Sequence, residues 1–335
     1  METTLRPLTL GEILDRTAEL YRSNFLLLAG ISSVYAGILL VLSLVQIGAQ
    51  QGARALHMNT GLIVVSVIGL VVLGLIIFVV GGLSIAANTR AVGWLHLGEP
   101  ASICAAYRAI LPRTGRYLWL MTVTYFRAWF PCVLIYAAFA TLLLYVRAKG
   151  LFAPHATHSD PQMMIVFLAS SVAFLFLLLG FLVYGILMSL RYALAVPACT
   201  VENLKALQAI RRSIQLSKGS RGRIFMLGLL ALIIQLGLTG LTQGFFIMVG
   251  IKNKGVIPVW MSVVQQLLAF LTNTFVQPIY ATGFTLFYYD QRVRKEGYDI
   301  EHMMQSVGMT QPPPMIEAHA AVDAAPFLDR GSGHE

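Results

Sequence analysis

Six long apolar runs dominate the hydropathy pattern of this chain, and each is long enough to cross a bilayer. They lie within residues 23–53, 55–89, 117–146, 161–190, 224–251 and 255–289. Because a transmembrane helix needs about 20 apolar residues, each run predicts one span. Pro258 and Pro278 predict a break or kink in the sixth. We therefore expect an all-α membrane domain over 1–303 and a disordered cytoplasmic tail over 304–335, which is rich in Pro, Ala, Gly and Ser.

An amphipathic pattern separates the fourth and fifth runs, at residues 196–223. Its apolar positions recur near a 3.6-residue period, with basic and amide positions opposite: Leu204, Leu207, Ile210 and Ile214 against Lys205, Gln208, Arg212 and Gln215. We expect a helix that lies flat on the bilayer, with its apolar side down and its basic side toward the headgroups. Residues 9–22 predict a second such helix, which opens with a capping box of Thr9 and Glu12.

These short helices predict an internal repeat. Residues 9–25, 100–117 and 202–225 each have the pattern of a short helix that leads into an apolar hairpin. We expect three units, each of one surface helix and two spans. The alternative is that basic residues recur at these positions only because the three segments face the same side of the membrane.

Composition supports a membrane location. The 335 residues are 57% hydrophobic and only 12% charged, whereas a soluble domain is about 25% charged. So little charge cannot cover a globular surface, so lipid must cover part of it. The net charge is +9, and in a chain this apolar it favours anionic lipid headgroups over nucleic acid as the partner.

The basic residues also predict the orientation. Of the 24 lysines and arginines, 18 lie in the N-terminal segment, the second-to-third and fourth-to-fifth connections, and the tail, and five lie in the other loops. By the positive-inside rule, both termini are predicted to be cytoplasmic.

The basic helix supplies the first candidate site, a contact with lipid headgroups or with a partner protein. Its residues are Lys205, Arg211, Arg212, Lys218, Arg221 and Arg223. A cation near an anionic membrane surface adds about 1 kcal/mol of binding free energy. The predicted partners are membrane lipids, preferably anionic, with a protein partner or a second copy of the chain as the alternative.

Arg127 is the second candidate, because it is the only charged residue well inside a predicted span. It lies about ten residues, or roughly 15 Å, from the cytoplasmic start of that span. An arginine at this depth costs about 2.5–3.5 kcal/mol on insertion scales. One hypothesis is an anion or lipid-phosphate contact that faces the bundle of a transporter or flippase-like protein. The alternative is a side chain that extends to the membrane interface.

Six amide side chains lie on the fifth and sixth runs: Gln235, Gln243, Gln265, Gln266, Asn273 and Gln277. We expect them to form interhelical hydrogen bonds, each worth about 0.6–2 kcal/mol. The alternative is that they line a path for a polar substrate.

The sequence offers no catalytic constellation. It contains no HExxH, Walker A or GxGxxG motif, and Cys104, Cys132 and Cys199 lie far apart without CxxC spacing. Acidic residues are nearly absent from the six runs. We therefore expect a protein that is not an enzyme and that binds neither a metal nor a cofactor.

Three stretches resemble a known family. LTLGEILDRTAELYRSNF (8–25), RYALAVPACTVENLKALQAIRRS (191–213) and LFYYDQRVRKEGYDIE (286–301) are similar to the glycerophosphoryl diester phosphodiesterase membrane domain of bacterial multi-span proteins. By this resemblance the motif positions are Pro197, Glu202, Arg211, Arg212, Ser213, Asp290, Arg292, Arg294, Glu296 and Asp299.

The resemblance implies a location but no activity. It implies the bacterial inner membrane. The family takes its name from members that are joined to a soluble catalytic barrel, and six spans with a short tail leave no room for one here. Members without the barrel have no assigned biochemical role.

Overall fold

The computed structural model describes residues 6–55, 59–148, 161–252 and 258–298, together with 300 and 304. Within these residues the fold is helical, without a strand. Six of the described helices are long and apolar enough to cross a membrane. The predicted all-α fold with six spans is therefore confirmed, while the predicted tail lies outside the described residues apart from Met304.

The six long helices pair into three hairpins, α2–α3, α5–α6 and α9–α10. Their bounds are Phe25–Ala55 for α2, Asn59–His96 for α3, Thr114–Ala148 for α5, Pro161–Tyr192 for α6, Arg221–Lys252 for α9 and Val259–Glu296 for α10. Pro258 is the N-cap of α10 rather than a break, and Pro278 lies inside this continuous helix. At 31–38 residues, each helix is roughly 45–57 Å long, against a hydrocarbon core of about 30 Å. The helices therefore extend beyond the lipid.

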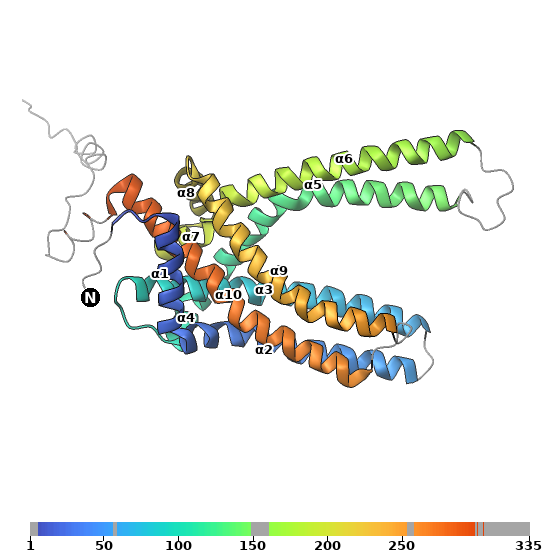
Figure 1. The fold of residues 1–335 in the computed structure, drawn as a ribbon, viewed down its shortest axis with the longest axis horizontal. Coiled ribbons are helices and arrows are strands. Elements are labelled where there is room, and N and C mark those ends of the chain that lie inside the picture. The colour runs from blue at the N-terminus through green and yellow to red at the C-terminus, as the bar shows by residue number, and fades with distance from the viewer. Residues whose placement is uncertain are drawn as a thin grey trace, which may run out of the picture.

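Short helices gather at one end of the long ones, which we call the cap (Figure 1). They are α1 (Leu10–Ser23), α4 (Ile103–Ile110), the 3₁₀ turn η1 (Leu111–Arg113), α7 (Ala195–Val201) and α8 (Ala206–Ser217). Both ends of the described chain also lie there. The predicted capping box of Thr9 and Glu12 opens α1. The single helix predicted over 196–223 is wrong, because Asn203 takes a left-handed φ of 59° and separates α7 from α8.

The three predicted units of one short helix and one hairpin are present, and they interlock. α1 packs on α10, α4 packs on α3, and α8 packs on α5 and α6. Each short helix thus contacts the hairpin of another unit, and the three contacts close a ring. A shared membrane side for the basic residues would not by itself produce this packing, so the three units repeat in the fold as well as in the charge pattern.

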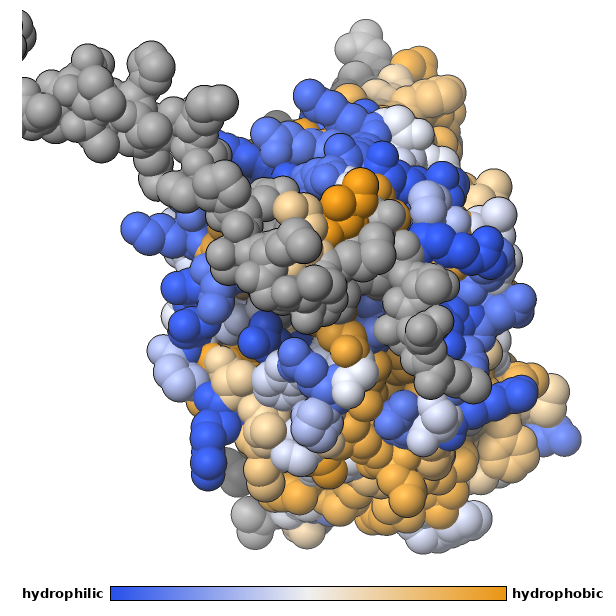
Figure 2. Space-filling model, turned by 90° about the vertical axis from the view of Figure 1, so that its left-hand side faces the viewer, coloured by the Kyte–Doolittle hydropathy of each residue, from blue (hydrophilic) through white to orange (hydrophobic). Residues whose placement is uncertain are grey.

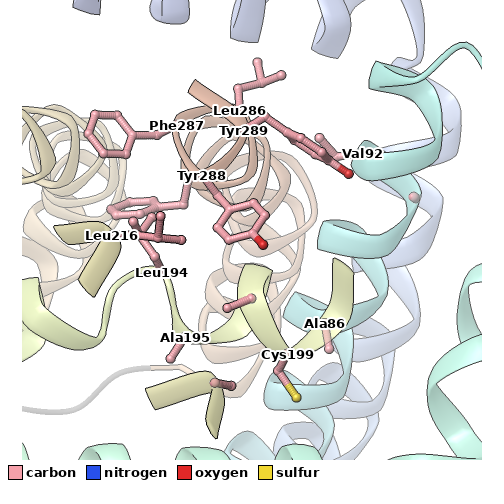
Figure 3. Packing of buried hydrophobic residues seen from close by; sticks show 14 of the residues in the cluster. Ala86, Val92, Leu194, Ala195, Cys199, Leu216, Leu286, Phe287, Tyr288 and Tyr289 are labelled. Atoms are coloured by element: carbon pink, nitrogen blue, oxygen red, sulfur yellow. The ribbon is translucent and has the colours of Figure 1, made fainter. Parts of the chain in front are cut away.

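The tightly packed core lies in the cap rather than in the membrane half. Ile13, Ile110 and Leu216 from three short helices are at most 1% exposed, and they belong to one cluster with Phe287 and Tyr288 of α10. Figure 3 shows α10 side chains packed toward α7 and α3. Seen from the cap end, hydrophilic residues cover much of the surface (Figure 2).

This core corrects the prediction that α8 rests its apolar face on lipid. Ile210 is 2% exposed against protein, and only Leu207 of the predicted apolar stripe faces outward, at 48% exposed. The physical reason is the length of the spans. Helix ends that project past the bilayer carry apolar surface into water, and the short amphipathic helices remove that surface from water.

Candidate functional site

A carboxylate at the end of α7 organises the charges of the cap. Both oxygens of Glu202 accept from Nε of Arg212 at 3.0 Å, and one also accepts from the hydroxyl of Tyr288. Nε of Arg292 lies 3.7 Å away. Arg212 also pairs with Glu296 at 2.5 Å. Burial by itself lowers the pKa of Arg212, but hydrogen bonds to Glu296 and Glu202 and their negative charges raise it above its usual value.

A second carboxylate, Asp290, ties the N-terminal segment to α9 and α10. Its side chain is fully buried. It accepts from the backbone N–H of Leu8 at 2.8 Å and from Nε of Arg294 at 3.0 Å, and it pairs with Arg223 at 3.2 Å. Both arginines also donate to the Leu8 carbonyl. These contacts lock the start of the chain onto the cap.

The six basic residues predicted to bind headgroups therefore divide into two groups. Arg212 and Arg223 are committed to buried or half-buried carboxylates. Lys205, Arg211 and Lys218 are exposed, and Arg221 is half-buried with no hydrogen-bond partner for its Nε in the described part of the chain. The predicted continuous basic face is thus reduced to three exposed cations.

Three other arginines meet where α7 turns into α8. Nη1 of Arg90 donates to the Thr200 carbonyl at 3.0 Å. Arg113 donates to the Asn203 side chain, and Arg116 donates to the Asn203 carbonyl at 2.8 Å. Throughout the described residues, none of the three arginines forms an ion pair with a carboxylate. We call Arg90, Arg113 and Arg116 the arginine cluster.

The arginine cluster lies beside side chains of the kind found at a membrane interface. Arg113 is exposed and Arg116 is half-buried, and they lie between two apolar side chains, Leu111 and Trp119, that are 59% and 57% exposed. Tryptophan is enriched at the headgroup level of membrane proteins, where basic residues also gather. The segment from Leu111 to Trp119 therefore has the pattern of a membrane interface.

A cavity of about 180 Å³ lies below α7, where the α5–α6 hairpin diverges from the other four long helices (Figure 1). α3, α5, α6, α7 and α10 all contribute to its wall, and Pro197 closes it from the α7 side. Most of its polar side chains carry hydroxyls, among them Thr89, Ser189 and Tyr280. All of its lining side chains are neutral, so it has no charge with which to hold an anion.

Arg127 does not face this cavity. Tyr125 and Trp129 of the same helix line the cavity, and a residue two positions away points roughly 200° round the helix. The Arg127 side chain is exposed, and its carbonyl accepts from Tyr184 of α6 at 3.4 Å. The hypothesis that Arg127 faces the bundle is therefore wrong.

Sequence reasoning missed the arginine cluster because its members come from different elements. Arg90 lies on α3, Arg113 in η1 and Arg116 on α5, and only folding brings them to residues 200–203. The one available signal was Arg113 and Arg116 beside an exposed aromatic at the start of a span. The clearer signal in the sequence was the periodic basic segment over residues 205–223.

The motif positions taken from the family resemblance fall largely within the cap network. Glu202, Arg212 and Glu296 form one set of ion pairs, and Asp290 with Arg294 forms another. Ser213 donates to the Arg191 carbonyl at 2.8 Å, Pro197 lies in α7, Arg211 is exposed, Arg292 lies 4.0 Å from the centre of the Tyr298 ring, and Asp299 lies outside the described residues. Comparisons with protein-family models, with curated proteins and with solved structures give no match to this chain. Membership in the family stays a prediction, and the fold assigns the chain to the polytopic α-helical membrane proteins.

Proposed function

We propose that this membrane protein is not an enzyme and that it binds anionic phospholipid headgroups through the arginine cluster. The observation that carries the proposal is the pair Arg113 and Arg116, which lack carboxylate partners among the described residues and lie one to two turns from Trp119. Exposed apolar side chains on both sides favour a lipid over a protein as the partner, because a phospholipid supplies a phosphate and acyl chains together.

Hydrogen bonds to Asn203 position the two arginines for this role. Both are held by Asn203, one through its side chain and one through its carbonyl. Neither contact neutralises the guanidinium charge. The remaining N–H groups stay available to phosphate oxygens, which arginine binds in a two-pronged geometry. At about 1 kcal/mol per cation, the pair contributes roughly 2 kcal/mol, or about 30-fold in affinity.

The experiment is native mass spectrometry of the full chain taken from bilayers of phosphatidylcholine with a minor fraction of phosphatidylglycerol. The unmodified protein is expected to retain phosphatidylglycerol selectively. Arg113→Gln with Arg116→Gln should lower this selectivity by about 30-fold. The matched control is Arg6→Gln with Arg16→Gln, which removes the same charge from arginines already paired with Glu12 and Glu19 at 2.6 Å.

Two results would overturn the proposal. In one, the Arg113 and Arg116 variant keeps its selectivity. In the other, Arg211→Gln with Lys218→Gln abolishes selectivity while the arginine-cluster variant does not, which would return the headgroup site to the face of α8 predicted from the sequence.

The proposal includes an orientation. The cap carries the predicted cytoplasmic segments, so the positive-inside rule supports a cap in the cytoplasm. Together with the family resemblance, this supports a bacterial inner-membrane protein with both termini inside. A transporter for an anionic substrate is the alternative, but Arg127 points away from the cavity below α7, and that cavity is lined by neutral groups.

A further inference from the structure

A second cavity of about 350 Å³ lies in the membrane half of the bundle, among α2, α9 and α10. Five polar side chains line it: Tyr35, Gln235, Asn273, Gln277 and Tyr280. Asn273 lies 14 residues from the start of α10, which is roughly 21 Å along the helix. This depth places the cavity within the hydrocarbon layer rather than at either surface.

The amides of this region differ in what they bind. Nε2 of Gln265 donates to Gln243, and the hydroxyl of Ser84 lies 3.5 Å from Oε1 of Gln277, as expected for polar groups that join helices. In the part of the chain that the structure describes, Gln235 donates only within its own helix, to Thr239. Among the described residues, the Asn273 amide has no hydrogen-bond partner from protein.

The hydroxyls of Tyr35 and Tyr280 likewise have no hydrogen-bond partner in the described part of the chain. A polar group left without a partner in hydrocarbon costs several kcal/mol. Asn273 and Tyr35 are half-buried and Tyr280 is 40% exposed, so the three groups can reach the cavity, where a polar occupant would supply the missing partners. A water molecule takes up about 30 Å³ in the liquid. The cavity volume of about 350 Å³ is several times larger, so the cavity can hold a small organic group as well as water.

The chemistry of the wall defines the class of occupant. Carboxamides donate and accept, and phenol hydroxyls do both, so the wall matches a group rich in hydroxyls. All lining side chains are neutral, so nothing there would compensate a buried phosphate or ammonium. We propose that this cavity binds a neutral polyhydroxyl group, carried either by a free polyol or by the headgroup of a glycolipid.

The surroundings provide a route of entry. Tyr280 lines this cavity and also the cavity below α7. The cavity below α7 lies where the α5–α6 hairpin diverges, so a lipid-borne group can approach from the side. The site is separate from the arginine cluster and does not depend on the proposed headgroup function.

The test measures binding to the purified full chain by native mass spectrometry, with sorbitol as the free polyol and monoglucosyl diacylglycerol as the lipid-linked one. One bound equivalent of either probe is expected, and the probe that binds identifies the source. Asn273→Leu should weaken that binding about tenfold without lowering the thermal unfolding midpoint, because no protein partner is lost. Gln265→Leu is the matched control: it breaks the contact to Gln243, lowers the midpoint and leaves binding unchanged.

Tyr280→Phe removes a single hydroxyl with little change in packing, and it tests the same site if the leucine variant does not fold. The proposal is overturned if neither probe binds, which would mean that the cavity holds water only. It is also overturned if Asn273→Leu and Tyr280→Phe both bind as tightly as the unmodified protein.

Discussion

Replacing Glu202 with Gln removes the negative charge shared by Arg212 and Arg292 while it keeps the size of the side chain. The Glu202 and Arg212 side chains are 17% and 23% exposed, so the pair is close to buried. Breaking a fully buried ion pair costs about 3–5 kcal/mol. The residual exposure and the second partner of Arg212, Glu296, reduce this, so Glu202→Gln should lower the free energy of unfolding by about 2–3 kcal/mol.

The assay is a double-mutant cycle of Glu202→Gln and Arg212→Gln, followed by thermal and denaturant unfolding in detergent. The interaction free energy of the pair is expected to be about 1–2 kcal/mol. The control cycle uses Arg16 and Glu19, whose side chains are 34% and 56% exposed. An exposed pair of this kind couples by less than about 0.5 kcal/mol.

The decisive quantity is the difference in interaction free energy between the two cycles. Equal interaction energies for the Glu202–Arg212 pair and for the Arg16–Glu19 pair would refute it. So would a stabilised Glu202→Gln variant, because that result would mean that desolvating the carboxylate outweighs its contacts.

Three further predictions concern the α7–α8 turn, α1 and the buried thiol. In denaturant titrations, the free energy of unfolding of Asn203→Gly should exceed that of Asn203→Ala by about 1–2 kcal/mol, because glycine adopts the left-handed φ without strain and alanine does not. Equal free energies would contradict a backbone role for Asn203. A hydrogen bond from the backbone N–H of Thr9 holds the pKa of Glu12 below 4.5, so its stabilising effect is complete above that value and is lost as the pH falls through the lower folded pKa. The protection of the first turn of α1 against hydrogen exchange, relative to the intrinsic exchange rate at each pH, should therefore fall at acid pH, and Glu12→Gln should abolish this dependence. Cys199 is 0% exposed, so a maleimide should modify it only after unfolding, and rapid labelling of the native protein would contradict the packing of α7.

Local patterns in the sequence predicted much of the fold. Each span was visible as an apolar run, and Thr9 with Glu12 marked the start of α1. These features depend on residues within a few positions of one another, so no knowledge of the tertiary structure was needed.

The environment of each amphipathic helix was not predictable in this way. An apolar stripe on α8 is equally consistent with lipid and with protein, and the choice depends on helix ends far away in sequence. The pairing of Arg212 with Glu296 likewise joins positions 84 residues apart. Periodicity identified the face of the helix but could not identify what covers it.

The candidate site shows the same limit. The sequence gives the number of basic residues, but whether each can bind a headgroup depends on which carboxylates of the folded protein pair with it. Arg212 looked like a headgroup contact and is paired with Glu202, whereas Arg116 was only one of many loop arginines and has no carboxylate partner among the described residues. The Asn273 amide was recognised as polar in a span, but its lack of a partner depends on the positions of neighbouring helices.

Cys104 offers a direct measurement of whether the cap faces the cytoplasm, which is the central claim. This thiol is exposed on α4 within the cap. A membrane-impermeant maleimide should label it in inside-out vesicles and leave it unmodified in intact cells, with Cys104→Ser as the background control. Labelling of Cys104 in intact cells would place the cap outside the cell and contradict both the orientation and the proposed inner-leaflet headgroup site.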